Sequence, residues 1–191
     1  TLSLAAGEGS AVTATARVSV LPDPRSGVAA AARLRNYQAL LELQELQAQA
    51  VTAVERIVRA RADVATVRAL LERHKQPGTE LPEALQALGE RAGAVSQGLD
   101  ELEQRFRTPP KTKGIVYDDD KVATRIGLAL GYVGSSRDAP TPTAEAYVEA
   151  ARQALTAATV ELDRFAATDL ADFAQAVSAT GIGLFGGAGP P

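Results

Sequence analysis

The chain of 191 residues contains no cysteine, no tryptophan, no methionine and only one histidine. Without cysteine there can be no disulfide bonds, thiolate metal sites or cysteine nucleophiles, and a single histidine excludes metal sites built from several imidazoles. Aromatic residues make up only 4% of the chain, whereas β-sandwiches and barrels usually need more aromatic and β-branched bulk. These absences favour a helical protein without thiol chemistry.

The chain also has no large excess of charge of one sign and no long apolar run. The 20 basic and 23 acidic residues are interspersed and leave a net charge of −3, so no basic face predicts nucleic acid as a partner. No apolar run approaches the roughly 18 residues that a membrane-spanning helix needs. An apolar content of 46% is ordinary for a globular protein, and we expect a folded chain that neither binds nucleic acid nor spans a membrane.

The first residues show the pattern of a β-hairpin. Apolar residues occupy every second position in Val12–Val20, which is the period of a strand. A weaker alternation begins in Leu2–Leu4, and Gly7–Gly9 predicts the turn between the two strands. Pro22 and Pro24 end the second strand because neither can donate to a sheet ladder. An isolated hairpin is marginal in water, so we expect this one either to complete a sheet supplied by other residues or to pack against the helices, and we favour the sheet.

After the prolines the apolar period changes from two to between three and four. No glycine or proline occurs from Val28 to Gln76, which predicts one helix of about 48 residues, roughly 70 Å long. The pair Pro77–Gly78 ends it. Its apolar residues recur in alternating steps of four and three, the spacing of a heptad seam: Ala39, Leu43, Leu46, Ala50, Ala53, Ile57, Ala60, Val64, Val67 and Leu71.

Three further segments have helical periodicity. A second seam extends over Leu81–Phe106 and is ended by Pro109–Pro110. A short helix is predicted over Asp120–Val133, and a last long helix begins near Thr143 and continues to Phe165. The apolar register then shifts at Thr168–Asp169, where the threonine is a candidate cap for one or two final turns.

The helix lengths predict a mainly α protein, a long antiparallel up-down-up helical bundle. The second helix and the short helix, end to end, match the first, and the last helix runs back, so the bundle has three legs with a broken middle leg. We divide the chain into a β-hairpin at 1–25, the bundle at 26–180 and a glycine-rich tail at 181–191. A compact four-helix bundle is the alternative, but it leaves part of the first helix without a partner.

The densest charge cluster is the run Asp118, Asp119 and Asp120. Three carboxylates in a row are a weak candidate for a Ca²⁺ site, but the spaced ligands, central glycine and distal glutamate of a calcium loop are absent. We interpret the run as a helix N-terminus, where aspartate caps the helix and complements its dipole.

Other polar features have structural interpretations. His74 lies in the last turn of the first helix, where cations are favoured, and no acid or nucleophile is predicted beside it. Four arginines of that helix alternate with acidic residues, which predicts a solvated face with local ion pairs: Arg56, Arg59, Arg61 and Arg68. Four tyrosines are too scattered to predict a base-stacking platform: Tyr37, Tyr117, Tyr132 and Tyr147. We predict no catalytic residue, no cofactor and no enzyme activity for this chain.

Four short stretches occur in a particular order: Val18–Arg25, Ala53–Ile57, Ser135–Thr143 and Asp169–Phe173. In this order and spacing they resemble the C-terminal region of bacterial sortilin-like β-propeller proteins with BNR repeats, which are often labelled glycosyl hydrolases. The resemblance covers nearly the whole chain, although the tail lacks the usual Leu-Pro ending of the family.

The resemblance implies that the hairpin is the last piece of an immunoglobulin-like linker domain and that a large exported propeller lies upstream. Any glycan- or peptide-directed activity would then belong to the propeller, since no catalytic residue of the family maps onto this chain. Export to the periplasm, the cell surface or the medium is likewise an expectation from the resemblance.

We therefore expect a non-catalytic C-terminal module that serves structural docking or assembly. Its expected partners are the upstream domains of the same polypeptide, another protein, or a second copy bound through the helix seams. One alternative is a self-standing coiled-coil adaptor that oligomerises through the first helix. Another is part of a glycoside hydrolase, which needs a pair of carboxylates across a cleft.

Overall fold

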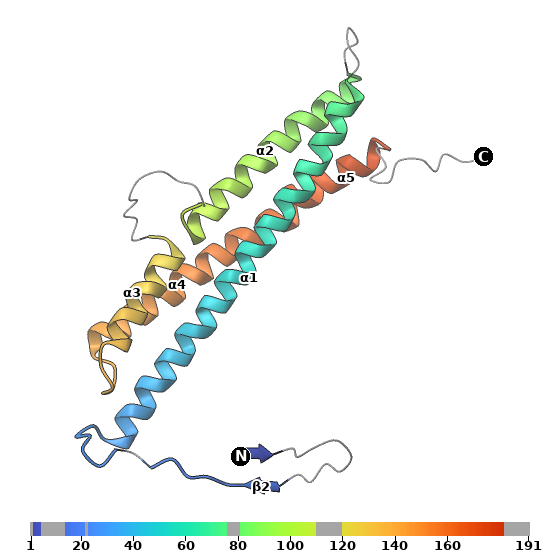
Figure 1. Ribbon diagram of the computed structural model, residues 1–191. Helices are drawn as coiled ribbons and strands as arrows, with labels where there is room; N and C mark the ends of the chain where they lie inside the picture. The colour runs from blue at the N-terminus through green and yellow to red at the C-terminus, as the bar shows by residue number, and fades with distance from the viewer. Residues whose placement is uncertain (1, 5–13, 22, 76–80, 110–119, 182–191) are drawn as a thin grey trace.

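The computed structural model describes residues 2–4, 14–21, 23–75, 81–109 and 120–181, and this part of the chain is mainly helical, as predicted (Figure 1). Its elements are β1 (Leu2–Leu4), β2 (Ala14–Ala16), α1 (Ala30–His74), α2 (Glu83–Phe106), α3 (Val122–Gly134), α4 (Pro142–Phe165), the π-helical turn η1 (Ala166–Leu170) and α5 (Ala171–Ala179).

The two short strands pair antiparallel, with Leu2 opposite Ala16. The predicted strand continues to Val20, but β2 ends at Ala16, opposite Leu2 at the start of β1, and among the described residues no strand pairs with the chain beyond it. Val18 and Val20 are accordingly 59% and 93% exposed. The predicted turn lies outside the described residues, so the complete hairpin and the immunoglobulin-like domain stay predictions.

Helix α1 is a single helix of 45 residues, in agreement with the uninterrupted sequence between the prolines. Every residue of its predicted seam is buried or half-buried, and Leu43 and Ile57 are completely buried. Most of the stability of a helix in a protein comes from packing such an apolar face rather than from intrinsic propensity. The buried seam therefore holds α1 in place along its length.

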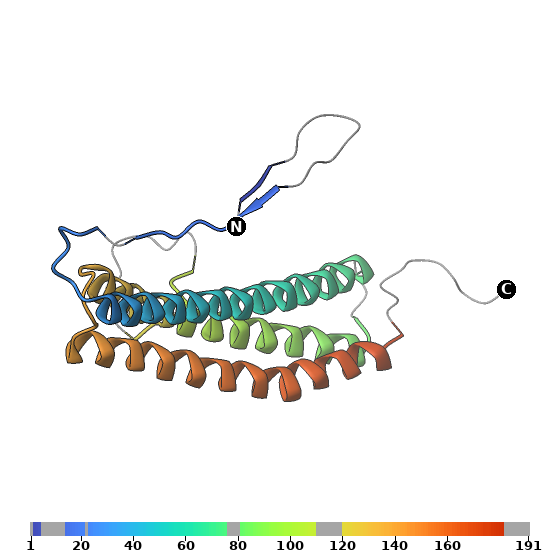
Figure 2. The ribbon, with the colours of Figure 1, turned by 90° about the horizontal axis from the view of Figure 1, so that it is seen from below.

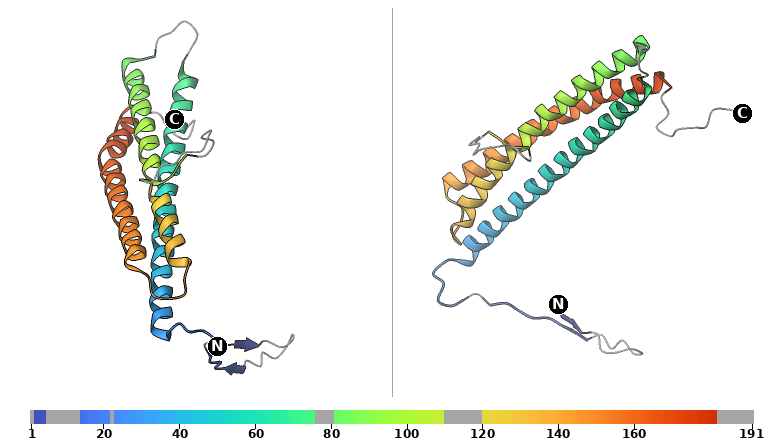
Figure 3. Two further views of the ribbon diagram at one scale, coloured as in Figure 1. Left: turned by 90° about the vertical axis from the view of Figure 1, so that its left-hand side faces the viewer. Right: turned by 45° about the horizontal axis from the view of Figure 1, so that its top comes forward.

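Helices α1 to α4 pack together as a bundle. Helices α2 and α3 follow one another along α1, and α4 packs against all three (Figures 1 and 2). Their buried residues join into one hydrophobic core from Leu43 to Phe173. The two further views in Figure 3 show the same arrangement, with α1 in contact with both segments of the α2–α3 pair.

The last helix changes register at the predicted place. Helix α4 begins at Pro142, where the Thr141 hydroxyl oxygen accepts a hydrogen bond from the Ala144 N–H at 3.2 Å. It passes through η1 into α5 without a break, and Thr168 donates to the Arg164 carbonyl at 3.0 Å instead of capping a new helix. A π-helical turn inserts one residue into the helical repeat, and Phe173 beyond it is buried in the core.

Polar and aromatic contacts connect the helices at defined points. Asn36 is buried on α1 and donates through Nδ2 to the Val133 carbonyl on α3 at 2.9 Å. Tyr132 on α3 stacks on Tyr147 on α4 with ring centroids 4.2 Å apart. These two tyrosines are therefore not scattered, as the sequence suggested, because the connection between α3 and α4 folds them face to face.

Gly98 on α2 allows α4 to approach closely, because a Cβ atom at this position would lie 2.5 Å from Cε2 of Phe165 on α4. A Cβ atom at Gly93, on the same helix, would meet no atom within 4 Å. We predict that Gly98→Ala lowers the free energy of unfolding by about 1–2 kcal/mol, because displacing the ring outweighs the gain of about 1 kcal/mol in helix propensity. Gly93→Ala should raise it by about 0.5–1 kcal/mol. Urea denaturation of both variants measures the difference, and equal stabilisation by the two would contradict the close packing.

Candidate functional site

The aspartate run is only partly described, since Asp118 and Asp119 lie outside the described residues. Asp120 is exposed and accepts a hydrogen bond from Arg125 Nη2 at 2.7 Å. The capping prediction is wrong for Asp120: the N-cap of α3 is Lys121, without a side-chain cap bond. Asp120 lies one residue too early, and its carboxylate reaches the first turn of α3 instead. Among the described residues, no three His, Asp or Glu side chains gather where they could hold a metal ion.

His74 has the structural role that its position predicts. Its Nδ1 lies 2.8 Å from the carbonyl oxygen of Leu70. A carbonyl oxygen only accepts, so the ring nitrogen donates to the carbonyl four residues earlier in α1.

The arginines of α1 do more than the predicted local pairing. Arg59 does pair locally, with Glu55 at 3.4 Å. Arg56, however, pairs with Asp163 on α4 at 2.8 Å, and Arg61 reaches Asp100 and Glu103 on α2, each at 2.7 Å. Arg56 and Arg61 flank the buried seam on opposite sides, and this position beside the seam is the signal from which the cross-helix pairs could have been predicted.

Glu103 is the most buried ionisable residue in the described chain, with its side chain 2% exposed. Burial by itself would raise the pKa of Glu103, but hydrogen bonds and charge from Arg61 and Arg107 outweigh it and hold the pKa below the ordinary value of 4.5. The carboxylate is therefore ionised at neutral pH. Sequence reasoning did not single out Glu103.

A buried carboxylate with a shifted pKa is a common mark of an active site, but here both oxygens are occupied. Oε2 lies 2.7 Å from Arg61 Nη2, and Oε1 lies 2.8 Å from Arg107 Nη2. The arrangement ties α1 to the end of α2, and it leaves the carboxylate no free oxygen for a substrate.

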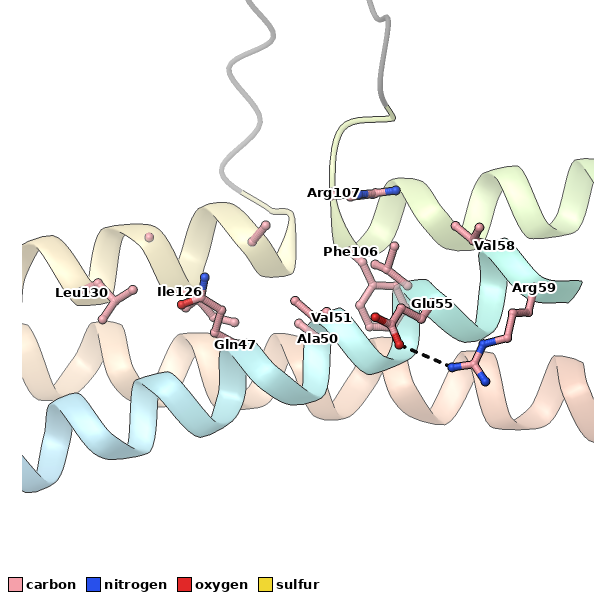
Figure 4. Close-up of a pocket in the computed structure, with 13 residues that line it drawn as sticks. Gln47, Ala50, Val51, Glu55, Val58, Arg59, Phe106, Arg107, Ile126 and Leu130 are labelled. Atoms are coloured by element: carbon pink, nitrogen blue, oxygen red, sulfur yellow. Dashed lines mark hydrogen bonds and ion pairs between the residues drawn. The ribbon is translucent and has the colours of Figure 1, made fainter. Parts of the chain in front are cut away.

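An apolar groove of about 530 Å³ lies where α2 ends and α3 begins, beside the middle of α1 (Figure 4). The interruption of the helix pair creates it, because the seam of α2 stops at Phe106 and that of α3 starts at Val122. Apolar side chains from three helices line the groove, among them Val54, Phe106 and Ile126. The polar side chains that line it include Gln47, Glu55, Arg59 and Arg107.

The face of α1 opposite the buried seam carries a second heptad pattern, which we call the outer stripe. From Tyr37 onward, each of its members precedes a seam residue by two positions, as Leu41 precedes Leu43. Because two residues rotate a helix by about 200°, this pattern lies on nearly the opposite face from the seam. All its members are exposed: Leu34, Tyr37, Leu41, Gln44, Ala48, Val51, Glu55, Val58, Ala62, Ala65 and Ala69. The five large apolar side chains among them are between 44% and 58% exposed.

The outer stripe and the groove meet at the middle of α1, where Val51 and Val58 belong to both. Large apolar side chains scattered singly over a surface are normal, whereas a regular apolar face with a groove beside it marks an interaction surface. This continuous surface is the candidate functional site. It can bind a helix or another apolar segment, and its side chains contain no nucleophile paired with a base.

No helix in the described part of the chain combines the length and apolar character needed to cross a membrane. Comparison of the sequence with models of protein families and with curated proteins, and of the fold with solved structures, returned no match.

Proposed function

We propose that this chain is a non-catalytic helical module whose function is assembly, and that it presents the outer stripe of α1 to another polypeptide helix. The observation that carries the proposal is the two-sidedness of α1. One face is buried along the bundle from Leu43 to Leu71, while the opposite face keeps a row of exposed side chains that are apolar except for Gln44 and Glu55. A helix that needed only to complete a bundle would have polar residues on that second face.

We further propose that the helices form the up-down-up bundle of three legs expected from their lengths, with α2 and α3 as the middle leg. Support comes from the packing of both α2 and α3 on α1, and of α4 on all three. Cross-helix pairs such as Arg56 with Asp163 and Arg61 with Glu103 fix α1 against both neighbouring legs. A fixed helix loses little conformational freedom when it binds, which favours association.

The place of this module in a larger protein is also a proposal. The resemblance suggests the C-terminal part of an exported sortilin-like β-propeller protein, docked to upstream domains of the same polypeptide. The exposed chain after β2, where Val20 is 93% and Leu21 82% exposed, supports a missing neighbour on the N-terminal side. A self-standing coiled-coil adaptor is the second candidate, favoured by the length of α1 and by the heptad spacing of its outer stripe.

Photo-cross-linking of the full chain tests the assembly function. A photoreactive residue at position 51 should give one defined adduct in the producing cells, identified by mass spectrometry. The matched control is position 160 on α4, because Val160 is equally apolar and 62% exposed but lies outside the outer stripe. Adducts of equal yield from both positions would contradict the proposal, and so would turnover of a glycoside by the purified chain.

A further inference from the structure

We infer that the outer stripe binds a second copy of this chain, with the two α1 helices antiparallel and Glu45 of each copy opposite Arg59 of the other. The inference rests on the proposed assembly function and names its partner. None of the described elements covers the stripe, since its residues from Leu34 to Ala69 are exposed.

The sizes of the side chains along the stripe favour the antiparallel orientation. The first part carries bulky residues at Leu34, Tyr37 and Leu41, and the last part carries only Ala62, Ala65 and Ala69. An antiparallel pair places the bulky end of each helix on the alanine end of the other, so that large side chains fill the space left by small ones.

The individual layers follow from the heptad pattern. Antiparallel helices pack the first core position of one heptad against the second core position of its partner. In the inferred register Tyr37 lies opposite Ala69 of the second copy, Leu41 opposite its Ala65, and Val58 opposite its Ala48. A parallel pair in register would instead stack tyrosine on tyrosine and alanine on alanine, and it would bring the two Glu55 carboxylates together, which repel each other.

Charges beside the stripe select one antiparallel register. Glu45 and Arg59 each follow a stripe residue by one position and are exposed. Shifting the second helix by one heptad in either direction places Glu45 opposite Thr52 or Thr66, which carry no charge. Of these three registers only the inferred one forms a glutamate–arginine pair, and twofold symmetry forms it twice. Both side chains now make contacts along their own helix, Glu45 with Gln49 at 3.1 Å and Arg59 with Glu55 at 3.4 Å, which the new pair can supplement.

The same register places the twofold axis near Thr52, at the level of the apolar groove. Val51, Glu55 and Val58, which line that groove, then lie at the centre of the interface. Glu55 of each copy lies opposite Val51 of the other and keeps its ion pair with Arg59 of its own helix at 3.4 Å. Anchoring residues of an interface cluster near its centre, where water is excluded best. The inferred dimer therefore covers the part of the outer stripe that adjoins the groove.

Sedimentation of the full chain over a wide concentration range gives the first test, and we expect a dimer. Leu41→Glu should raise the dimer dissociation constant more than about 100-fold, because it buries an unpaired charge twice in each dimer. Val160→Glu makes a comparable change at an exposed apolar residue of α4 and should leave the constant unchanged. Circular dichroism checks that both variants stay folded. A parent chain that is monomeric at all concentrations overturns the inference.

A charge exchange tests the register and does not depend on Leu41→Glu folding. Glu45→Arg and Arg59→Glu should each raise the dissociation constant about tenfold, because each puts like charges opposite one another twice. The double variant should return to within about threefold of the parent. Failure of the double variant to recover would exclude this register.

Single cysteines test the orientation, because the chain has no cysteine of its own. A mixture of Leu41→Cys and Ala65→Cys chains should form a mixed disulfide on mild oxidation, whereas Leu41→Cys alone should not. The reverse result would show a parallel pair and overturn the inference. If the chain is monomeric but position 51 still cross-links to another polypeptide, the dimer is wrong and the assembly function stands. If position 51 cross-links to nothing, both are wrong.

Discussion

Glu103→Gln should lower the free energy of unfolding by about 2–3 kcal/mol at neutral pH. Removing one partner of a buried ion pair typically costs 3–5 kcal/mol, and the loss is smaller here because Arg61 and Arg107 stay 32% and 40% exposed. Glutamine keeps the volume of the side chain, but its amide nitrogen replaces one of the two oxygens and faces a guanidinium group that can only donate. Chemical denaturation at one fixed protein concentration measures the loss, because the stability of an associating protein depends on concentration.

The pH dependence of this loss has a definite sign. The pKa of Glu103 is lowered in the folded chain. The ionised carboxylate therefore contributes its full stabilisation at a pH above the ordinary carboxyl pKa, and this stabilisation is lost as the pH falls through the lowered pKa of the folded chain. Parent and Glu103→Gln should therefore converge in acid. Glu101→Gln is the matched control, because Glu101 is exposed on the same helix and bonds to Gln97 at 2.9 Å. A penalty for Glu103→Gln that persists in strong acid would show that packing, not charge, is responsible.

The second large effect is expected in the core. Leu99 on α2 is 0% exposed, whereas Leu128 on α3 is 38% exposed. Leu99→Ala should lower the free energy of unfolding by about 3–4 kcal/mol, through lost burial plus the cavity that remains. Leu128→Ala should cost no more than about 1 kcal/mol.

Both leucine substitutions make the same chemical change and the same change in helix propensity, so their difference measures burial alone. Urea unfolding curves with equal slopes would give this difference directly. Equal losses at the two positions would contradict the packing of α2 against α1 and α4.

The helices were predictable because their determinants are local. The limits of α1 follow from the absence of glycine and proline, and its buried seam follows from spacing alone, which is why residues such as Leu43 and Ile57 are buried as predicted. The register shift near Thr168 was also visible in the apolar pattern, although the spacing did not distinguish a new cap from the π-helical turn that forms.

Features that depend on distant residues were missed or wrong. Glu103 gains its role from Arg61, which lies on another helix, and no pattern around Glu103 reports that partner. The aspartate run was interpreted as a capped helix N-terminus, but α3 begins beyond Asp120, and Arg125 binds the Asp120 carboxylate. The outer stripe repeats the spacing of the buried seam but includes Gln44 and Glu55, and its exposed apolar side chains become evident as a surface only in the fold.

The interruption between α2 and α3 has a consequence for how the chain folds. Helices adjacent in sequence pack on each other, α2 on α1 and α4 on α3, so the described helices contain two local pairings within one core. Local pairings of this kind close short loops and favour fast folding. We expect each pair to form early by itself, and the slower step to be the docking of the α3–α4 pair onto the N-terminal half of α1. Asn36 and Val133 would meet only at that step.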